Sequence, residues 1–195
     1  MRLTLVRHPA PQIAPGLCYG SSDIPAQPQA LAQALDALAA TLPRADGIVI
    51  YSSPLQRCAA LSVPLAARLH LPAPLFDARL AEMHFGDWER QPWDRIARAD
   101  IDAWAADLLR HAPGGGETVL QVAHRVAAFL DMLRRAPNQD AIIVCHAGTI
   151  RLLSAFHQAA LRGEDLTGAA LAAAALHAAA TPHSIAYGAT VPLQF

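Results

Sequence analysis

The feature that most constrains the fold is an alternation between short strand-like runs and longer helical periodicities. Apolar runs rich in β-branched residues predict strands that are buried on both faces of a parallel sheet, at residues 3–6, 47–51 and 141–145. Apolar residues recur at helical spacing between these runs, at residues 31–42, 54–69, 93–109 and 122–133. Strands that alternate with helices predict an α/β fold with right-handed crossovers.

Further elements are predicted around this framework. Pro54 is well placed at the first position of a helix, with Ser53 before it as the N-cap. The Ala-rich stretch 168–180 reads as a helix, and residues 184–187 and 190–193 read as late strands. The chain shows no internal repeat and no long linker, so we expect one domain spanning residues 1–195.

Composition and charge exclude two classes of partner. Hydrophobic residues make up 53% of the chain and charged residues 16%, which predicts a folded core rather than disorder. The net charge of −1 and the absence of a basic run argue against nucleic-acid binding. The uncharged stretch after Asp165 is rich in weakly apolar alanine and is interrupted at His177, Thr181 and Pro182, so no membrane span is predicted.

The cysteines and the N-terminus bear on the compartment. Three widely spaced cysteines, Cys18, Cys58 and Cys145, suit reduced thiols better than a disulfide framework. The apolar run before Arg7 is too short for a secretory signal. We therefore expect a cytoplasmic protein, and a homodimer is left open.

Reactive side chains follow the predicted strands directly. The first strand is followed by Arg7 and His8, the second by a segment that contains Arg57, and the third by His146. Ligands of parallel α/β sheets bind beyond the carboxyl ends of the strands. If these strands are neighbours, two histidines and two arginines meet at one edge of the sheet.

This combination of residues suits a phosphate. Guanidinium groups match phosphate oxygens with two parallel donors. Positive charge from Arg7 and Arg57 favours the neutral form of His8, and a neutral imidazole nitrogen is a nucleophile. The residues alone therefore indicate phosphoryl transfer through His8.

A phosphatase also needs a proton donor for the leaving oxygen. Residues 80–89 show no clear periodicity, as expected for an active-site loop, and they contain Glu82, Asp87 and Glu89. Glu82 is the candidate, and spacing alone does not separate it from Asp87 or Glu89.

Five motifs in this order resemble those of the histidine phosphatase superfamily, which includes the cofactor-dependent phosphoglycerate mutases. They lie at residues 5–8 (Leu-Val-Arg-His), 51–57 (Tyr-Ser-Ser-Pro-Leu-Gln-Arg), 82–89, 115–118 (Gly-Gly-Glu-Thr) and 144–151 (Val-Cys-His-Ala-Gly-Thr-Ile-Arg). The resemblance implies a three-layer α/β/α sandwich with a mostly parallel central sheet. It also implies metal-independent hydrolysis of a small phosphate ester without a cofactor.

The resemblance assigns roles to the candidate residues. It makes His8 the nucleophile, Glu82 the proton donor, and Arg7, Arg57 and His146 the phosphate pocket. Substrate contacts are further expected from Ser21, Ser22 and Ala147.

Three positions depart from the family pattern. Pro9 stands where the family usually has Gly, Ala14 where many members have Asn, and Ser21 where many have Arg. Pro9 contributes no backbone donor. Ser21, Ser22 and the backbone of Gly20 are the expected substitutes as phosphate donors.

Within the superfamily, residues 16–25 look most like the α-ribazole phosphatases of cobalamin biosynthesis. This predicts α-ribazole 5′-phosphate or adenosylcobalamin 5′-phosphate as substrate, with Trp88 and Trp93 available to stack on the base. A broad-specificity phosphatase, a phosphoglycerate mutase and a non-catalytic phosphate-binding regulatory module remain as alternatives. The other histidines show no metal-type pairing, and among them His84 is the best candidate for a role in the site because it lies in the acid loop.

Overall fold

The computed structural model describes residues 1–45, 47–136, 140–182 and 184–195. Its centre is a five-stranded sheet with the strand order β3-β2-β4-β1-β5. The strands are β1 (Arg2–Arg7), β2 (Val49–Ser52), β3 (Leu75–Phe76), β4 (Asp140–Cys145) and β5 (Thr190–Gln194). All neighbouring strands pair in parallel except β5, which runs antiparallel to β1. The predicted α/β class and mostly parallel sheet are therefore confirmed.

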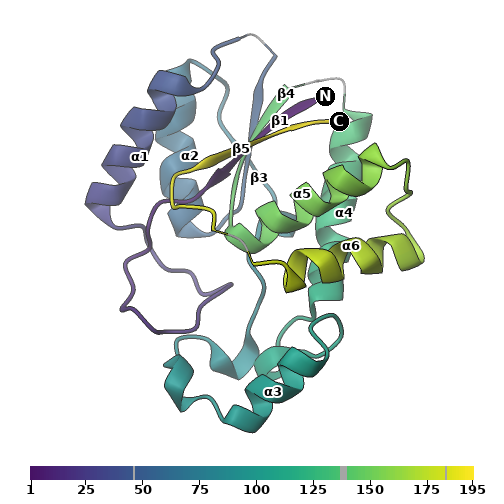
Figure 1. Ribbon diagram of the computed structural model, residues 1–195. Helices are drawn as coiled ribbons and strands as arrows, with labels where there is room; N and C mark the ends of the chain where they lie inside the picture. Colours follow the sequence, from purple (N-terminus) through teal and green to yellow (C-terminus); the bar gives the residue numbers. More distant parts are fainter. Residues whose placement is uncertain (46, 137–139, 183) are drawn as a thin grey trace.

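Helices cover both faces of the sheet, which gives the expected three layers (Figure 1). On one face lie α1 (Pro28–Thr41) and α2 (Gln56–Leu69), and on the other α4 (Val119–Arg135), α5 (Ala147–Leu161) and α6 (Gly168–Ala180). Each face has its own apolar core, and the central strand β4 contributes to both, because its side chains alternate between the two faces.

A separate group of elements lies beyond the carboxyl ends of the strands, at the lower end of Figure 1. It contains α3 (Arg98–Ala106) and short 3-10 helices at Gly86–Trp88, Trp93–Arg95 and Pro113–Gly115, whereas the 3-10 helix Ala78–Leu80 packs on α4 and places Leu80 in the main core. Cys18, Trp88 and Ile96 form a small apolar cluster that holds this group together. These elements therefore wall the edge of the sheet where ligands of α/β proteins bind.

Several predicted boundaries are corrected. Helix α2 begins at Gln56 rather than at Pro54, and Ser53 accepts a hydrogen bond from the Leu55 amide instead of capping the helix. The predicted helix 93–109 is a 3-10 turn followed by α3, because Ile96 and Ala97 between them are extended.

The C-terminal part shows one wrong and one correct prediction. Residues 184–187 are not a strand. They pass beside the end of β1, where the Ile185 carbonyl accepts a hydrogen bond from the side chain of Arg7. Residues 190–193 do lie in a strand, β5, which pairs with β1. Among the described residues, no helix combines the length and the apolar character needed to cross a lipid bilayer.

Candidate active site

His8 follows β1 directly and is almost completely buried, at 2% exposure. Its Nδ1 atom lies 2.7 Å from the carbonyl oxygen of Pro9. A carbonyl only accepts, so Nδ1 carries the proton and the lone pair is on Nε2. Burial and the charges of Arg57 and Arg7 lower the pKa of His8 to about 3, against a weaker opposing effect of the hydrogen bond to Pro9. His8 is therefore neutral at ordinary pH, with Nε2 free to react.

His146 lies beside His8, with 5.0 Å between the ring centroids. It follows β4 and precedes the first residue of α5, and β4 is the direct neighbour of β1 in the sheet. Its Nε2 is 2.8 Å from the hydroxyl of Ser53, which follows β2. Burial, the neighbouring His8 and the nearby arginines together hold the pKa of His146 well below its usual range. The expected convergence of the strand ends is confirmed.

Arg7 and Arg57 supply positive charge at this point. Arg57 is fully buried and donates to the carbonyls of Ser22 at 2.7 Å and Gly20 at 2.5 Å. Arg7 donates to the carbonyl of Ile185. The Nε atoms of both arginines are buried and have no hydrogen-bond partner among the described residues. A buried donor without a partner is costly, so both groups are suited to a ligand with acceptor oxygens.

Two tyrosines that sequence reasoning missed contact these arginines. The guanidinium carbon of Arg7 lies 3.9 Å from the ring centroid of Tyr187, and that of Arg57 lies 5.7 Å from the ring centroid of Tyr19. The two tyrosine hydroxyls are 2.8 Å apart. Tyr19 lies in the segment that the sequence singled out, whereas nothing in the sequence marks Tyr187. The tyrosines thus restrain both guanidinium groups from outside.

Glu82 approaches the start of α5. Its carboxylate accepts hydrogen bonds from the amides of Gly148 at 3.0 Å and Met83 at 3.2 Å. A Cβ atom at position 148 would lie 2.3 Å from a Glu82 oxygen, so only glycine allows this approach. Glu82 lies in the same cavity as His8, Arg7 and Arg57. The predicted acid is therefore brought to the predicted nucleophile.

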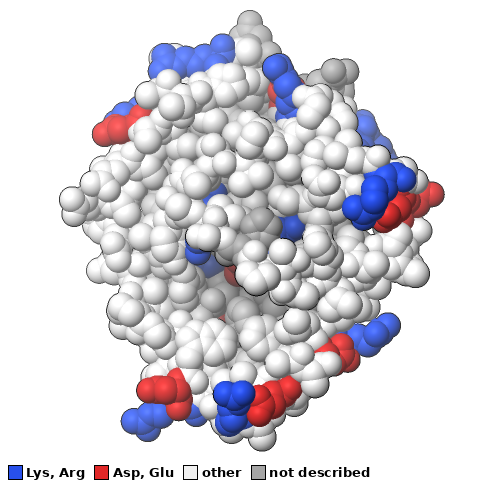
Figure 2. All heavy atoms as spheres, in the orientation of Figure 1, with Lys and Arg blue, Asp and Glu red and all other residues white. Residues whose placement is uncertain are grey.

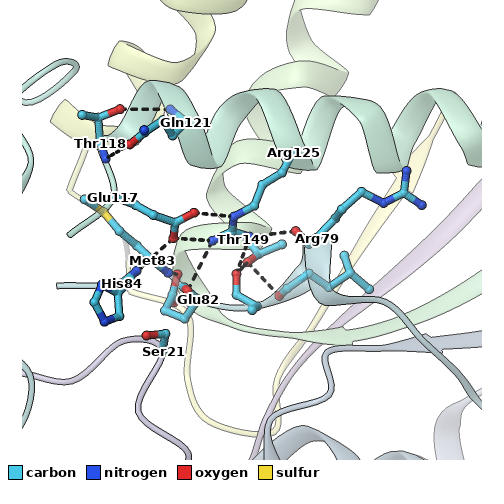
Figure 3. Close-up of polar contacts among 12 residues, drawn as sticks. Ser21, Arg79, Glu82, Met83, His84, Glu117, Thr118, Gln121, Arg125 and Thr149 are labelled. Carbon is cyan, nitrogen blue, oxygen red and sulfur yellow. Dashed lines mark hydrogen bonds and ion pairs between the residues drawn. The ribbon is translucent and has the colours of Figure 1, made fainter. Parts of the chain in front are cut away.

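The backbone around Glu82 is held from behind by α4 (Figure 3). Arg125 donates to the carbonyls of Arg79 at 2.8 Å and Ala81 at 2.7 Å, and it pairs with Glu117 at 2.9 Å. Glu117 in turn accepts from the amide of His84 at 3.0 Å. The Gly-Gly-Glu-Thr motif thus positions the acid segment, and sequence reasoning did not identify Arg125.

Ser21 and Ser22 are placed differently from the expectation. Their amides and hydroxyls donate to the carboxylate of Glu89, which also accepts from the amides of Gly20 and Phe85. The expected phosphate donors of this segment are therefore already used, and neither serine lines the cavity. Burial alone would raise the pKa of Glu89, but these hydrogen bonds outweigh it and hold the pKa low, so Glu89 is a structural acceptor. Asp87 is exposed.

The cavity has a volume of about 400 Å³. In Figure 2 it is the hollow at the centre of the face, where arginine and acidic atoms lie at the floor, and the other charged groups lie toward the rim of the molecule. Its polar lining includes Ala147 and Gly148 at the start of α5, and a third arginine, Arg151, one turn further along. Its apolar walls are Leu17, Met83, Phe85, Trp93, Trp104, Leu108, Val119, Val122, Leu152, Ala178 and Ala179.

The aromatic expectations are met only in part. Trp93 lines the cavity, whereas Trp88 is buried in the small cluster beneath it, at 6% exposure. Trp104 lines the cavity instead, and its ring packs edge-on against Phe85 and Trp88. His84 is exposed, and its Nδ1 accepts from the amide of Gly86 at 3.3 Å.

The chain is similar to known phosphatases. Residues 3–177 match the family model of the histidine phosphatase superfamily, branch 1. A putative phosphoserine phosphatase 2 of Hydrogenobacter thermophilus is 28% identical over 78% of this chain and 76% of that protein. A glucosyl-3-phosphoglycerate phosphatase of Mycolicibacterium vanbaalenii is 32% identical over 61% of this chain, and the match spans 57% of that protein.

The fold of a solved relative agrees with these matches. The native structure of a mycobacterial glucosyl-3-phosphoglycerate phosphatase superposes with a TM-score of 0.75 at 26% identity, covering 99% of this chain and 89% of that one. The family match extends over most of the chain and contains the convergent histidines and arginines. The chain therefore belongs to branch 1 of the histidine phosphatase superfamily and is a phosphatase of that type.

Proposed function

We propose that the protein hydrolyses small phosphate monoesters through a phosphohistidine at His8. The neutral Nε2 of His8 attacks phosphorus, a P–N bond forms, and the P–O bond to the leaving group breaks. The nucleophile is ready without prior deprotonation, because the proton of the ring is on Nδ1.

Arg7, Arg57 and His146 bind the transferring group. The Nε atoms of Arg7 and Arg57, which no described residue accepts from, offer hydrogen bonds that cost no reorganisation. Buried guanidinium donors that have no partner among the described residues, beside a buried neutral histidine, are the observation that carries the proposal. His146 is held by Ser53 and packs against the ring of His8, directly behind the nucleophile.

Glu82 serves both halves of the reaction. As a carboxylic acid it gives its proton to the leaving oxygen, and as a carboxylate it then takes a proton from water. The water oxygen attacks phosphorus, the P–N bond breaks, and inorganic phosphate leaves with His8 neutral again. The amides of Gly148 and Met83 hold the carboxyl group in place during both steps.

The nucleophile is tested by His8→Ala, with His124→Ala as the matched control because His124 is an exposed histidine on α4. Chelator-treated wild-type protein and the control are expected to hydrolyse p-nitrophenyl phosphate and to form an acid-labile phosphoenzyme. His8→Ala is expected to do neither. Full turnover in His8→Ala would refute the proposal. Phosphate binding without turnover by wild-type protein, on a broad panel of esters, would support a non-catalytic module instead.

The acid is tested by Glu82→Gln. Glutamine keeps acceptor capacity for the two amides but gives no proton, so kcat is expected to fall by about 10²–10⁴. Phosphate affinity is expected to stay within about twofold, because the arginine donors are untouched. Asp87→Asn is the matched control, since Asp87 is exposed. A comparable loss of kcat in Asp87→Asn would contradict the assignment of Glu82 as the proton donor.

The substrate predicted from residues 16–25 is α-ribazole 5′-phosphate or its adenosylcobalamin derivative. The aromatic walls around Phe85, Trp93 and Trp104 support a flat leaving group. The relatives named above act on phosphoserine and glucosyl-3-phosphoglycerate, which carry a carboxylate. Esters with a flat base and esters with a carboxylate are therefore the two candidate substrate classes, and both would be hydrolysed by the same reaction.

One comparison separates these classes and the remaining alternatives. We would measure kcat/KM for α-ribazole phosphate, phosphoserine, phosphoglycerates and sugar phosphates. A preference of more than about tenfold for one class, or ~1.4 kcal/mol, identifies it. A smaller spread indicates a broad-specificity phosphatase, and phosphoryl transfer between glycerate hydroxyls with bisphosphoglycerate indicates a mutase. Cytoplasmic location and dimerisation stay predictions from the sequence.

A further inference from the structure

The cavity contains a third arginine, beyond the two that the proposed reaction uses. Arg7 and Arg57 flank His8, whereas Arg151 lines the cavity from α5, three residues after Gly148. Residues three apart lie on the same face of a helix, so Arg151 follows Gly148 along the wall. The sequence placed Arg151 in a motif but assigned it no role.

The guanidinium of Arg151 is only partly satisfied. Its Nη2 donates to the carbonyls of Ala179 at 3.0 Å and Thr181 at 2.8 Å, at the end of α6. Its Nε is buried and has no partner within the described ranges. In the part of the chain that the structure describes, Arg151 forms no ion pair; burial lowers its pKa, and the charge of Glu82 offsets this only in part. A half-buried cation without a counterion favours an anionic ligand.

The position of Arg151 indicates which part of a substrate it would meet. Glu82 is bonded to the Gly148 amide, and in the proposed reaction Glu82 serves the leaving oxygen. Arg151 lies further along α5, on the side of Glu82 where Leu152 and the end of α6 line the cavity. The described wall beyond Glu82 is therefore apolar except for this one cation.

We propose that Arg151 binds a carboxylate on the leaving group of the substrate. This inference rests on the proposed phosphatase function and specifies its substrate class. With both hydrogens of Nη2 bonded to Ala179 and Thr181, Arg151 keeps Nε and Nη1 as its remaining donors. These donors and one positive charge suit the single charge of a carboxylate, whereas a second phosphate would need more donors than this wall provides. The substrate is thus a phosphate monoester with a carboxylate a few bonds from the ester oxygen and an apolar or small body between.

Arg151 also has a structural role, because its bonds to Ala179 and Thr181 tie α5 to the end of α6. A test has to separate this role from substrate binding. Loss of the hydrogen bonds between α5 and α6 would lower activity toward every ester alike. Loss of a carboxylate contact would lower activity only toward carboxylated esters.

The test compares two esters that differ in one group, 3-phosphoglycerate and glycerol 3-phosphate. Wild-type protein is expected to prefer 3-phosphoglycerate by about tenfold or more in kcat/KM, mainly through KM. In Arg151→Gln this preference is expected to fall to about one, with activity on glycerol 3-phosphate kept within about threefold. Arg151→Lys is expected to retain part of the preference, since it keeps the charge.

Arg110→Gln is the matched control, because Arg110 is exposed and follows the cavity-lining segment that contains Leu108. It removes the same charge and is expected to leave the preference unchanged. Thermal melting of each variant measures the stability that the hydrogen bonds from Arg151 to the end of α6 contribute. Equal losses on both esters in Arg151→Gln, no preference in the wild type, or a stronger activity on α-ribazole phosphate than on 3-phosphoglycerate would overturn the inference.

Binding distinguishes a failure of this inference from a failure of the proposed reaction. Calorimetry with His8→Ala measures affinity for both esters without turnover. Weaker binding of 3-phosphoglycerate alone when Arg151→Gln is added supports the carboxylate contact, whatever the fate of the phosphohistidine. Equal affinity for both esters in His8→Ala contradicts it, even if wild-type protein is an active phosphatase.

Discussion

The Nδ1 atom of His8 is paired with a carbonyl that belongs to the next residue, Pro9. The family pattern usually has Gly at this position, and Pro9 lacks the backbone donor that Gly has. The carbonyl, however, is common to both residues, and it is the group that sets the tautomer of His8. At this position a backbone acceptor is therefore enough to prepare the nucleophile.

Gly148→Ala is expected to separate stability from catalysis. The new Cβ would lie 2.3 Å from Glu82 Oε1, so the carboxylate has to move. A displacement of this size lowers kcat by about 10²-fold, while alanine in a helix is stabilising by up to ~1 kcal/mol. Steady-state kinetics and thermal melting measure the two effects. If the added methyl group acts through Glu82, the double variant with Glu82→Gln loses no more than Glu82→Gln alone, and an additive loss would contradict this explanation.

The buried histidines predict a pH dependence of stability. The pKa of His8 is about 3 in the folded protein and near 6.5 in the unfolded chain, and that of His146 is also lowered. Between these values the unfolded chain binds more protons, so the free energy of unfolding falls as the pH is lowered. Each histidine contributes a slope of up to ~1.4 kcal/mol per pH unit.

Urea unfolding between about pH 5 and 6.5 measures this slope above the range of most carboxylates. The slope of His8→Gln is expected to be clearly smaller than that of wild type, because the variant lacks one histidine with a lowered pKa. His124→Ala, which removes an exposed histidine, is expected to keep the wild-type slope. Equal slopes in wild type and His8→Gln would show that His8 is not kept neutral by the fold.

At the scale of elements, α4 and α5 hold different parts of the segment around Glu82. α5 presents the Gly148 amide to the Glu82 carboxylate, whereas α4 holds the backbone that carries Glu82 through Arg125. The start of α4 is fixed by reciprocal hydrogen bonds between Thr118 and Gln121, at 3.1 and 2.7 Å. The position of the acid thus depends on two helices that approach from different directions (Figure 3).

Arg125→Met is expected to lower both kcat and stability. It removes the donors to three carbonyls and leaves Glu117 without its ion pair, at a cost of about 2–3 kcal/mol. Thr118→Ala is the control on the same helix. It loses one cap, at about 1 kcal/mol, and is expected to leave kcat unchanged. Chemical denaturation and steady-state kinetics test both variants. If Thr118→Ala lowers kcat as much as Arg125→Met, the effect reflects general loosening of α4.

At the scale of the molecule, charge is distributed unevenly although the net charge is only −1. The cavity contains three arginines and Glu82, so it is positive inside an almost neutral protein. An anion that enters it binds the folded state and not the unfolded chain. We propose that residues 1–195 unfold as one domain, so that this binding stabilises the whole chain.

Inorganic phosphate is therefore expected to raise Tm. At a concentration of 100 Kd the stabilisation is about 2.7 kcal/mol, which corresponds to a shift of about 5–10 °C for a chain of this size. The shift is expected to persist in Glu82→Gln and to disappear in Arg57→Met, which removes a buried donor of the phosphate pocket. Scanning calorimetry measures it. An equal shift in Arg57→Met would place the anion elsewhere.

The sequence alone determined the class of fold and the groups that meet at the sheet edge. Short buried strands and helical periodicity are local patterns, and residues after parallel strands reach a common edge whichever loops connect them. His8, Arg57 and His146 could therefore be found by their positions after strands. Glu82 lies in a loop without periodicity, and only the resemblance separated it from Asp87 and Glu89.

Tertiary structure alone decided how polar groups are shared among neighbours. Ser21 and Ser22 were expected at the phosphate, yet Glu89 takes their donors, because the carboxylate lies where four amides converge. The role of Arg151 likewise depends on which carbonyls and walls surround it. Hydrogen-bond partners far apart in the chain leave no periodic trace in the sequence, since they depend on the packing of whole elements rather than on local spacing.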